Sequence, residues 1–141
     1  MILYVVDASV VIKWFVPEIH GDAARRLLSA PHEYFSPDLL FSEVGNTIWK
    51  KVRRGELTVA QGEGLVADIS TVAVETVPTR DLLVDAHALA VATGVTVYDA
   101  MYLALAVRLE TEMITADDRL TRTLAAHPMT AVHVRPIQTF E

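Results

Sequence analysis

Short runs of consecutive apolar residues alternate along this chain with longer segments in which apolar positions recur at helical spacing. Residues 2–6 are apolar at every position, which is typical of a strand buried on both faces of a sheet. Further strands are predicted at residues 33–36, 73–77, 96–98, 113–115 and 131–134. Helices are predicted between them, at residues 9–16, 22–28, 37–54, 58–70, 80–93, 100–109 and 120–126.

Residues that start or stop helices support these boundaries. Pro17 and Gly55 follow the first and third predicted helices, where each would end a helix. Thr58 begins the fourth helix, with Gln61 as its capping-box partner. Gly94 closes the helix that starts near residue 80.

Strands that alternate with helices predict an α/β protein in which helices cover both faces of a parallel sheet, a three-layer α/β/α sandwich. At 141 residues the chain is long enough for one continuous core. No linker, repeat or low-complexity segment interrupts the pattern, so we expect one domain over residues 1–141.

The composition indicates the class of protein and its cellular compartment. With 52% hydrophobic and 21% charged residues, the chain is an ordinary globular sequence. It contains no cysteine, which excludes disulfides and thiolate metal sites and favours a reducing cytoplasm. The apolar N-terminus lacks a basic leader, and the longest uncharged stretch, residues 86–98, is too short to span a bilayer. We therefore expect a cytoplasmic protein with no membrane partner.

The net charge of −6 argues against a nucleic-acid partner but does not exclude one. A local basic cluster ends the third predicted helix and consists of Lys50, Lys51, Arg53 and Arg54. Such a cluster is either a solubilising helix end that suits the helix dipole or a contact for an RNA backbone.

Four acids stand out by their placement. Asp7, Asp99 and Asp117 each follow a predicted strand, and Glu43 is the one charged residue of the apolar stretch 39–44. Taken alone, each aspartate is typical of a turn or a helix N-cap. However, the carboxyl ends of parallel strands meet at one edge of a sheet, where such folds bind their ligands. The four acids are therefore predicted to form one site.

Clustered carboxylates repel one another. At an effective dielectric near 20, the repulsion within a pair about 4 Å apart costs up to about 4 kcal/mol. A cation or protonation relieves this repulsion, and oxygen ligands select Mg²⁺ or Mn²⁺ rather than zinc. The chain has no Walker lysine loop and no Gly-x-Ser-x-Gly, and its glycine-containing run at residues 62–67 lies inside a predicted helix. Metal-assisted hydrolysis of a phosphodiester fits these features.

Three segments, residues 5–10, 98–106 and 115–120, together with Glu43 and Asn46, resemble PIN-domain ribonucleases and in particular the VapC toxins of prokaryotic toxin–antitoxin pairs. The likeness covers essentially the whole chain. Its most specific part is the run Tyr-Asp-Ala-Met-Tyr-Leu-Ala-Leu-Ala at residues 98–106.

The resemblance implies a PIN-like fold and a Mg²⁺-dependent endoribonuclease, with Mn²⁺ as a substitute, that hydrolyses single-stranded or looped RNA. It also implies a homodimer and a cognate antitoxin. The metal-binding and catalytic acids that it implies are Asp7, Glu43, Asp99 and Asp117, and all four are present. The hydroxyls that it implies as helping to arrange the site are Ser9 and Thr115.

Several residues have competing interpretations. Asn46 shares a helical face with Glu43 and either supports the site or is an ordinary exposed residue. Asp118 competes with Asp117 but is favoured as a solvated first-turn acid. Trp14 and Trp49 are favoured for core or dimer contacts over base stacking. Tyr98 and Tyr102 are favoured for packing.

Two other functions compete with a ribonuclease. A haloacid-dehalogenase-like phosphatase would need a second aspartate where Ser9 stands, which argues against that class. A catalytically silent PIN-fold module that binds RNA or protein is the alternative that metal titration would distinguish.

Overall fold

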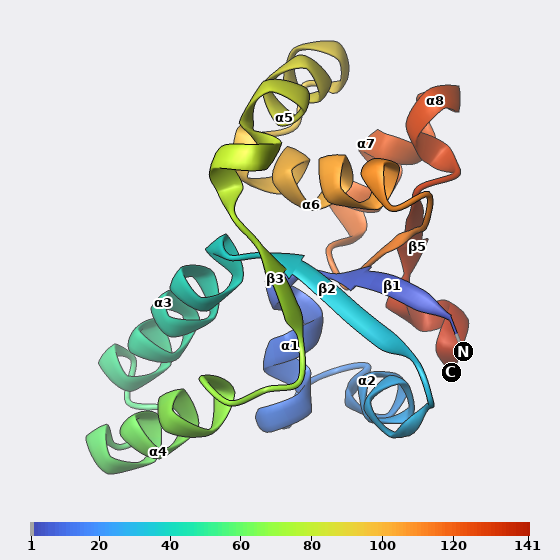
Figure 1. Cartoon of the computed structure of the whole chain (residues 1–141). Helices are drawn as coiled ribbons and strands as arrows, with labels where there is room; N and C mark the ends of the chain where they lie inside the picture. Colours follow the sequence, from blue (N-terminus) through green and yellow to red (C-terminus); the bar gives the residue numbers. More distant parts are fainter. Residues whose placement is uncertain (1) are drawn as a thin grey trace.

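The computed structural model of the protein describes residues 2–141 and has a single five-stranded sheet at its centre (Figure 1). The strands are β1 (Leu3–Val6), β2 (Glu33–Pro37), β3 (Glu75–Val77), β4 (Met113–Thr115) and β5 (Val134–Pro136). They lie in the order β3-β2-β1-β4-β5, and every neighbouring pair is parallel. The predicted parallel sheet is therefore confirmed.

Helices cover both faces of the sheet, as the predicted three-layer sandwich requires. Figure 1 shows one layer below the sheet, made of α1 (Ala8–Phe15), α2 (Gly21–Ser29), α3 (Leu39–Arg53) and α4 (Val59–Ile69). The other layer contains α5 (Thr79–Thr93), α6 (Val97–Arg108), α7 (Asp118–Ala125) and the short α8 (Pro128–Ala131). A 3₁₀ helix, η1 (Ile137–Phe140), ends the chain.

The alternation of side chains along β1 divides the core into two parts. Tyr4 and Val6 join the apolar cluster that contains α1, α2 and α3, whereas Val5 joins the cluster of α5, α6 and α7. Such a strand is apolar at successive positions because each of its faces is covered by helices. This explains why the first run of the sequence shows no polar alternation.

The connections between strands reverse direction at the centre of the sheet. The chain leaves β1 through α1 and α2 to reach β2 on one side, and it leaves β4 through α7 and α8 to reach β5 on the other. Such a reversal separates the loops that follow the two neighbouring strands and opens a crevice at their carboxyl ends. The sheet thus offers a binding position between the ends of β1 and β4.

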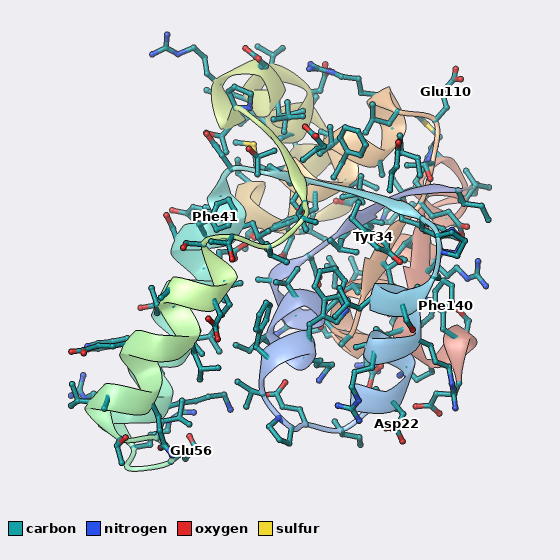
Figure 2. The ribbon with its side chains drawn as sticks, turned by 60° about the horizontal axis from the view of Figure 1, so that its bottom comes forward. Asp22, Tyr34, Phe41, Glu56, Glu110 and Phe140 are labelled. Atoms are coloured by element: carbon teal, nitrogen blue, oxygen red, sulfur yellow. The ribbon has the colours of Figure 1, made fainter. Side chains whose placement is uncertain are left out.

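Helices α3 and α4 form a pair that extends from the sheet (Figure 1), and Figure 2 labels Glu56 in the loop between them. The predicted capping box of Thr58 and Gln61 is present at the start of α4. The two helices approach closely at Gly62, since a Cβ atom there would lie 2.7 Å from Cγ2 of Val52. The pair is tightly packed near this glycine.

The structure corrects two predicted strands. Residues 96–98 do not form one, because the Thr96 hydroxyl accepts a hydrogen bond from the backbone N–H of Asp99 and caps α6, which begins at residue 97. The last strand is Val134–Pro136 rather than residues 131–134, since Pro128 starts the short helix α8. The predicted stop at Gly94 is confirmed by its φ of 83°.

Among residues 2–141, no single helix is long and apolar enough to cross a membrane, and α5 and α6 meet the length and composition only as a pair bent by 112°.

Candidate active site

Asp7 lies directly after β1 and is nearly buried, with 7% of its surface exposed. Its Oδ1 accepts hydrogen bonds from the Ser9 hydroxyl at 2.5 Å and from the backbone N–H of Val10 at 3.3 Å. Its Oδ2 accepts a hydrogen bond from the Thr115 hydroxyl. Asp7 is thus the N-cap of α1 and at the same time a rigidly held carboxylate.

Ser9 and Thr115 join Asp7 to the turn that follows β4. The Ser9 hydroxyl accepts a hydrogen bond from the backbone N–H of Ala116 at 2.9 Å, and the Thr115 hydroxyl accepts one from that of Asp117 at 3.1 Å. Both hydroxyls therefore contact Asp7 and the turn at once. They hold the ends of β1 and β4 at a fixed separation.

The other three acids come from three different elements around this point. Asp117 is exposed and caps α7, with its Oδ1 accepting a hydrogen bond from the backbone N–H of Leu120 at 3.0 Å. Glu43 is half-buried in α3, and Asp99 is half-buried in the first turn of α6. The prediction that Asp99 follows a strand, or itself caps the helix that comes after it, is wrong, since Thr96 is the cap.

The acids influence one another electrostatically. Burial, the largest cause, and the charge of Asp99 raise the pKa of Asp7 from 3.8 to about 6, although hydrogen bonds from Ser9, Thr115 and Val10 lower it. Burial and the charge of Asp99 also raise the pKa of Glu43, while burial and the charge of Asp117 raise that of Asp99. Asp99 is therefore the carboxylate that couples to each of the other three.

Tyr102 is a member of this cluster that the sequence interpretation assigned to packing. It is 2% exposed, and its hydroxyl donates a hydrogen bond to Oε1 of Glu43 at 2.6 Å. Burial, the hydrogen bond with Glu43 and the charges of Glu43, Asp7 and Asp99 all raise the pKa of Tyr102. The sequence contained one indication of this role: Tyr102 lies three residues after Asp99, which places both side chains on one helical face.

Residues 4–124 match the PIN domain family, a stretch that contains all four acids. This chain belongs to the PIN-domain family. It is 36% identical over 124 residues to ribonuclease VapC3 of Pyrobaculum aerophilum, covering 86% of this chain and 95% of that relative.

Two solved structures share the fold of this PIN domain. A toxin–antitoxin complex from Klebsiella pneumoniae has a TM-score of 0.67 at 18% identity, with 95% of this chain and 97% of that chain covered. VapC20 of Mycobacterium tuberculosis, described as a sarcin–ricin loop cleaving toxin, has a TM-score of 0.65 at 17% identity, with 84% and 93% covered. Each likeness shows a common architecture.

The donor set of this PIN domain suits a hard divalent cation, because it consists of carboxylates and hydroxyls only. As the side chains stand, no three His, Asp or Glu residues within residues 2–141 are close enough together to hold a metal ion. Without a cation, the carboxylates repel one another, and this repulsion favours a larger distance between them. Asp7 is held in place, so a bound cation would require the less constrained acids to move toward it.

Within residues 2–141, no side-chain hydrogen bond joins Asn46, Asp118 or Tyr98 to the four acids. Asn46 is exposed, and no side-chain hydrogen bond joins it to Glu43 or to any other residue of 2–141. Asp118 is exposed in the first turn of α7, as predicted, and accepts a hydrogen bond from Gln138 at 2.9 Å. The packing interpretation fails for Tyr98, which is 62% exposed one residue before Asp99.

The basic cluster occupies the last turn of α3 and the residue after it, at the opposite end of the helix from Glu43. Lys51 forms an ion pair with Glu18 at 3.2 Å, and the Arg53 guanidinium lies 5.3 Å from the ring centroid of Trp49. Trp49 is 53% exposed, whereas Trp14 is buried and donates a hydrogen bond to the Ala24 carbonyl. Part of the cluster is thus already paired within the protein.

Proposed function

We propose that this PIN domain is a Mg²⁺- or Mn²⁺-dependent endoribonuclease and the toxin of a type II toxin–antitoxin pair. The observation that carries the proposal is the electrostatic coupling of Asp7, Glu43, Asp99 and Asp117, which come from four separate segments. Asp7 and Asp117 lie at the carboxyl ends of the neighbouring strands β1 and β4. The similarity to a ribonuclease and to the structure of a toxin–antitoxin complex supports the choice of substrate and partner.

The four acids would hold the cation, with Ser9 and Thr115 orienting Asp7. A hard divalent cation, when bound, supplies activation of water and neutralisation of the charge that develops on a scissile phosphate. Without it the cluster would repel an RNA phosphate, because four of its side chains are acidic and the others, Ser9, Thr115 and Tyr102, are neutral.

The protein's own residues prepare this site by fixing one carboxylate and leaving others adjustable. Three donors hold Asp7, so its two oxygens keep one orientation. Asp117 is exposed and Asp99 is half-buried, which marks the side of the cluster from which a phosphodiester can approach. A site that is rigid on its buried side and open on the other suits a substrate as large as RNA.

The proposed partners are an RNA substrate, a cognate antitoxin and a second copy of this chain. For the homodimer, α5 supplies an exposed apolar surface, since Leu83, Val84 and Val91 are 51%, 82% and 74% exposed. Apolar side chains gathered on one helix are typical of an interaction surface. Sedimentation of the purified chain at several concentrations tests this part of the proposal.

The activity itself is tested by incubating the purified protein with a mixed RNA pool in Mg²⁺, Mn²⁺ or EDTA. An identically purified Asp7→Asn variant exposes any contaminating nuclease. We expect metal-dependent products that the variant does not form, and their mapped ends would identify the cleaved sequence. Identical products from both proteins would refute the proposal, and RNA binding without cleavage in any metal would favour the silent binding module.

A further inference from the structure

The hydrogen bond from Tyr102 to Glu43 joins the two helical layers at the edge of the acidic cluster. Tyr102 belongs to α6, and Glu43 lies 59 residues earlier in α3. Among the hydrogen bonds of residues 2–141, it is the one that connects α3 to α6. Because this contact between the two layers ends on a carboxylate of the site, it is placed to control the orientation of that carboxylate.

Tyr102 has more than a packing role in this position. Its ring is buried among the apolar residues of α6, where phenylalanine would fill nearly the same space. Burying the additional hydroxyl without a partner would cost about 1–3 kcal/mol, so the group is tolerated because it has an acceptor. The acceptor is a carboxylate, and a phenol that faces carboxylates acts as a hydrogen-bond donor.

The four acids differ in how firmly they are held. Asp7 has three donors, and Asp117 is fixed as the cap of α7. Glu43 has the longest side chain of the four and therefore the most rotamers to lose on ordering. Among residues 2–141, Tyr102 is the one donor to its carboxylate, which accepts through Oε1 and leaves Oε2 available.

We propose that Tyr102 is a positioning residue that keeps the Glu43 carboxylate at the acidic cluster, with Oε2 free to bind the divalent cation of the proposed site. This inference rests on the proposed function. Donors that orient a ligating carboxylate contribute about 10- to 100-fold to metal affinity in proteins. Without the phenol, Glu43 would sample rotamers that carry its carboxylate into solvent, and the cation would lose one prepared ligand.

The test is Mn²⁺ binding measured without RNA, from the electron paramagnetic resonance signal of the free ion. We expect Tyr102→Phe to weaken Mn²⁺ binding about 10-fold or more. A matched control is Tyr34→Phe, because Tyr34 is also buried and its hydroxyl donates to the Leu27 carbonyl in the core, away from the acids. That variant should lose stability and bind Mn²⁺ like the wild type.

A double-mutant cycle separates positioning from a general structural effect. Glu43→Ala removes the group through which Tyr102 is proposed to act, so adding Tyr102→Phe to it should weaken Mn²⁺ binding no further. Equal weakening by Tyr102→Phe in both backgrounds would overturn the inference, as would an unchanged affinity in the single variant.

If Tyr102→Phe does not fold, Glu43→Asp provides a second test with the phenol intact. The aspartate is one methylene shorter and cannot reach both the phenol and the cation, so Mn²⁺ affinity should fall. An unchanged affinity in Glu43→Asp would again count against positioning. A wild-type protein that binds no Mn²⁺ would overturn the proposed function along with this inference, whereas normal wild-type binding with unaffected variants would overturn the inference alone.

Discussion

Replacing Asp7 with asparagine should stabilise the metal-free protein at neutral pH even though it removes a central acid of the site. Burial and the neighbouring Asp99 make the charged form of Asp7 unfavourable in the folded state, which raises its pKa from 3.8 to about 6. Asparagine has nearly the same shape and no charge. The variant therefore avoids the burial of a carboxylate.

The magnitude follows from the pKa and from the hydrogen bonds of the site. One pKa unit corresponds to about 1.4 kcal/mol, so a rise from 3.8 to about 6 corresponds to about 3 kcal/mol once Asp7 is fully ionised. The amide would turn one acceptor into a donor, and the Thr115 hydroxyl would have to accept instead of donate. Since such a rearrangement costs about 1 kcal/mol, we expect a net gain of about 2 kcal/mol.

The gain should depend on pH in a definite direction. A carboxyl group whose pKa is higher in the folded than in the unfolded state binds more protons when folded between pH 3.8 and about 6. Wild-type stability should therefore fall as the pH rises through this window, and the part of the fall that Asp7 causes should be missing from Asp7→Asn. Near pH 4 the variant should be no more stable than the wild type.

Urea unfolding in EDTA, repeated across this pH range, measures the effect. Asp118→Asn is the control, because Asp118 is exposed in the same region and its acceptor oxygen for Gln138 is kept. That variant should follow the wild-type pH dependence. A difference between Asp7→Asn and wild type that stays constant with pH would refute the reasoning, since the effect would then not come from the charge.

Three further substitutions have defined outcomes. Asp99→Asn should abolish cleavage. In EDTA it should also raise the melting temperature by a few degrees, a stabilisation on the order of 1 kcal/mol, because it relieves repulsion among the acids. Equal melting temperatures of variant and wild type would contradict the clustering of the acids. Gly62→Ala should lower the free energy of unfolding by about 1–2 kcal/mol, since the added Cβ would lie 2.7 Å from the stiff side chain of Val52. Gly64→Ala, with nothing within 4 Å of the added atom, should raise it by about 0.5–1 kcal/mol, and urea unfolding of both variants checks the pair.

The sequence was sufficient to predict the parallel sheet, because it follows from strand and helix periodicity. Asp7 and Asp117 were predicted from their positions after apolar runs, and β1 and β4 are indeed neighbours. Asp99 was included for a reason that the structure overturns. Val95, Thr96 and Val97 have the β-branched side chains of a strand, but the Thr96 hydroxyl caps a helix instead.

Contacts between distant helices could not be predicted from periodicity. The spacing of Asp99 and Tyr102 shows that they share a helical face, but it does not show that α3 lies opposite that face. The partner of Tyr102 therefore became visible only when α3 and α6 were placed around the sheet. The same holds for Gly62, whose role depends on how closely α4 approaches Val52.

The hydrogen bond from Thr115 to Asp7 spans 108 residues, and β1 pairs with residues 113 and 114. During synthesis, a chain that has not yet reached β4 therefore lacks one of the two strands that pair with β1, and it lacks the Thr115 hydroxyl that donates to Asp7. A fragment that stops before that strand cannot assemble the four acids, whatever else of the fold it contains. A cell that makes this protein thus receives the complete site only after residue 117 has been translated.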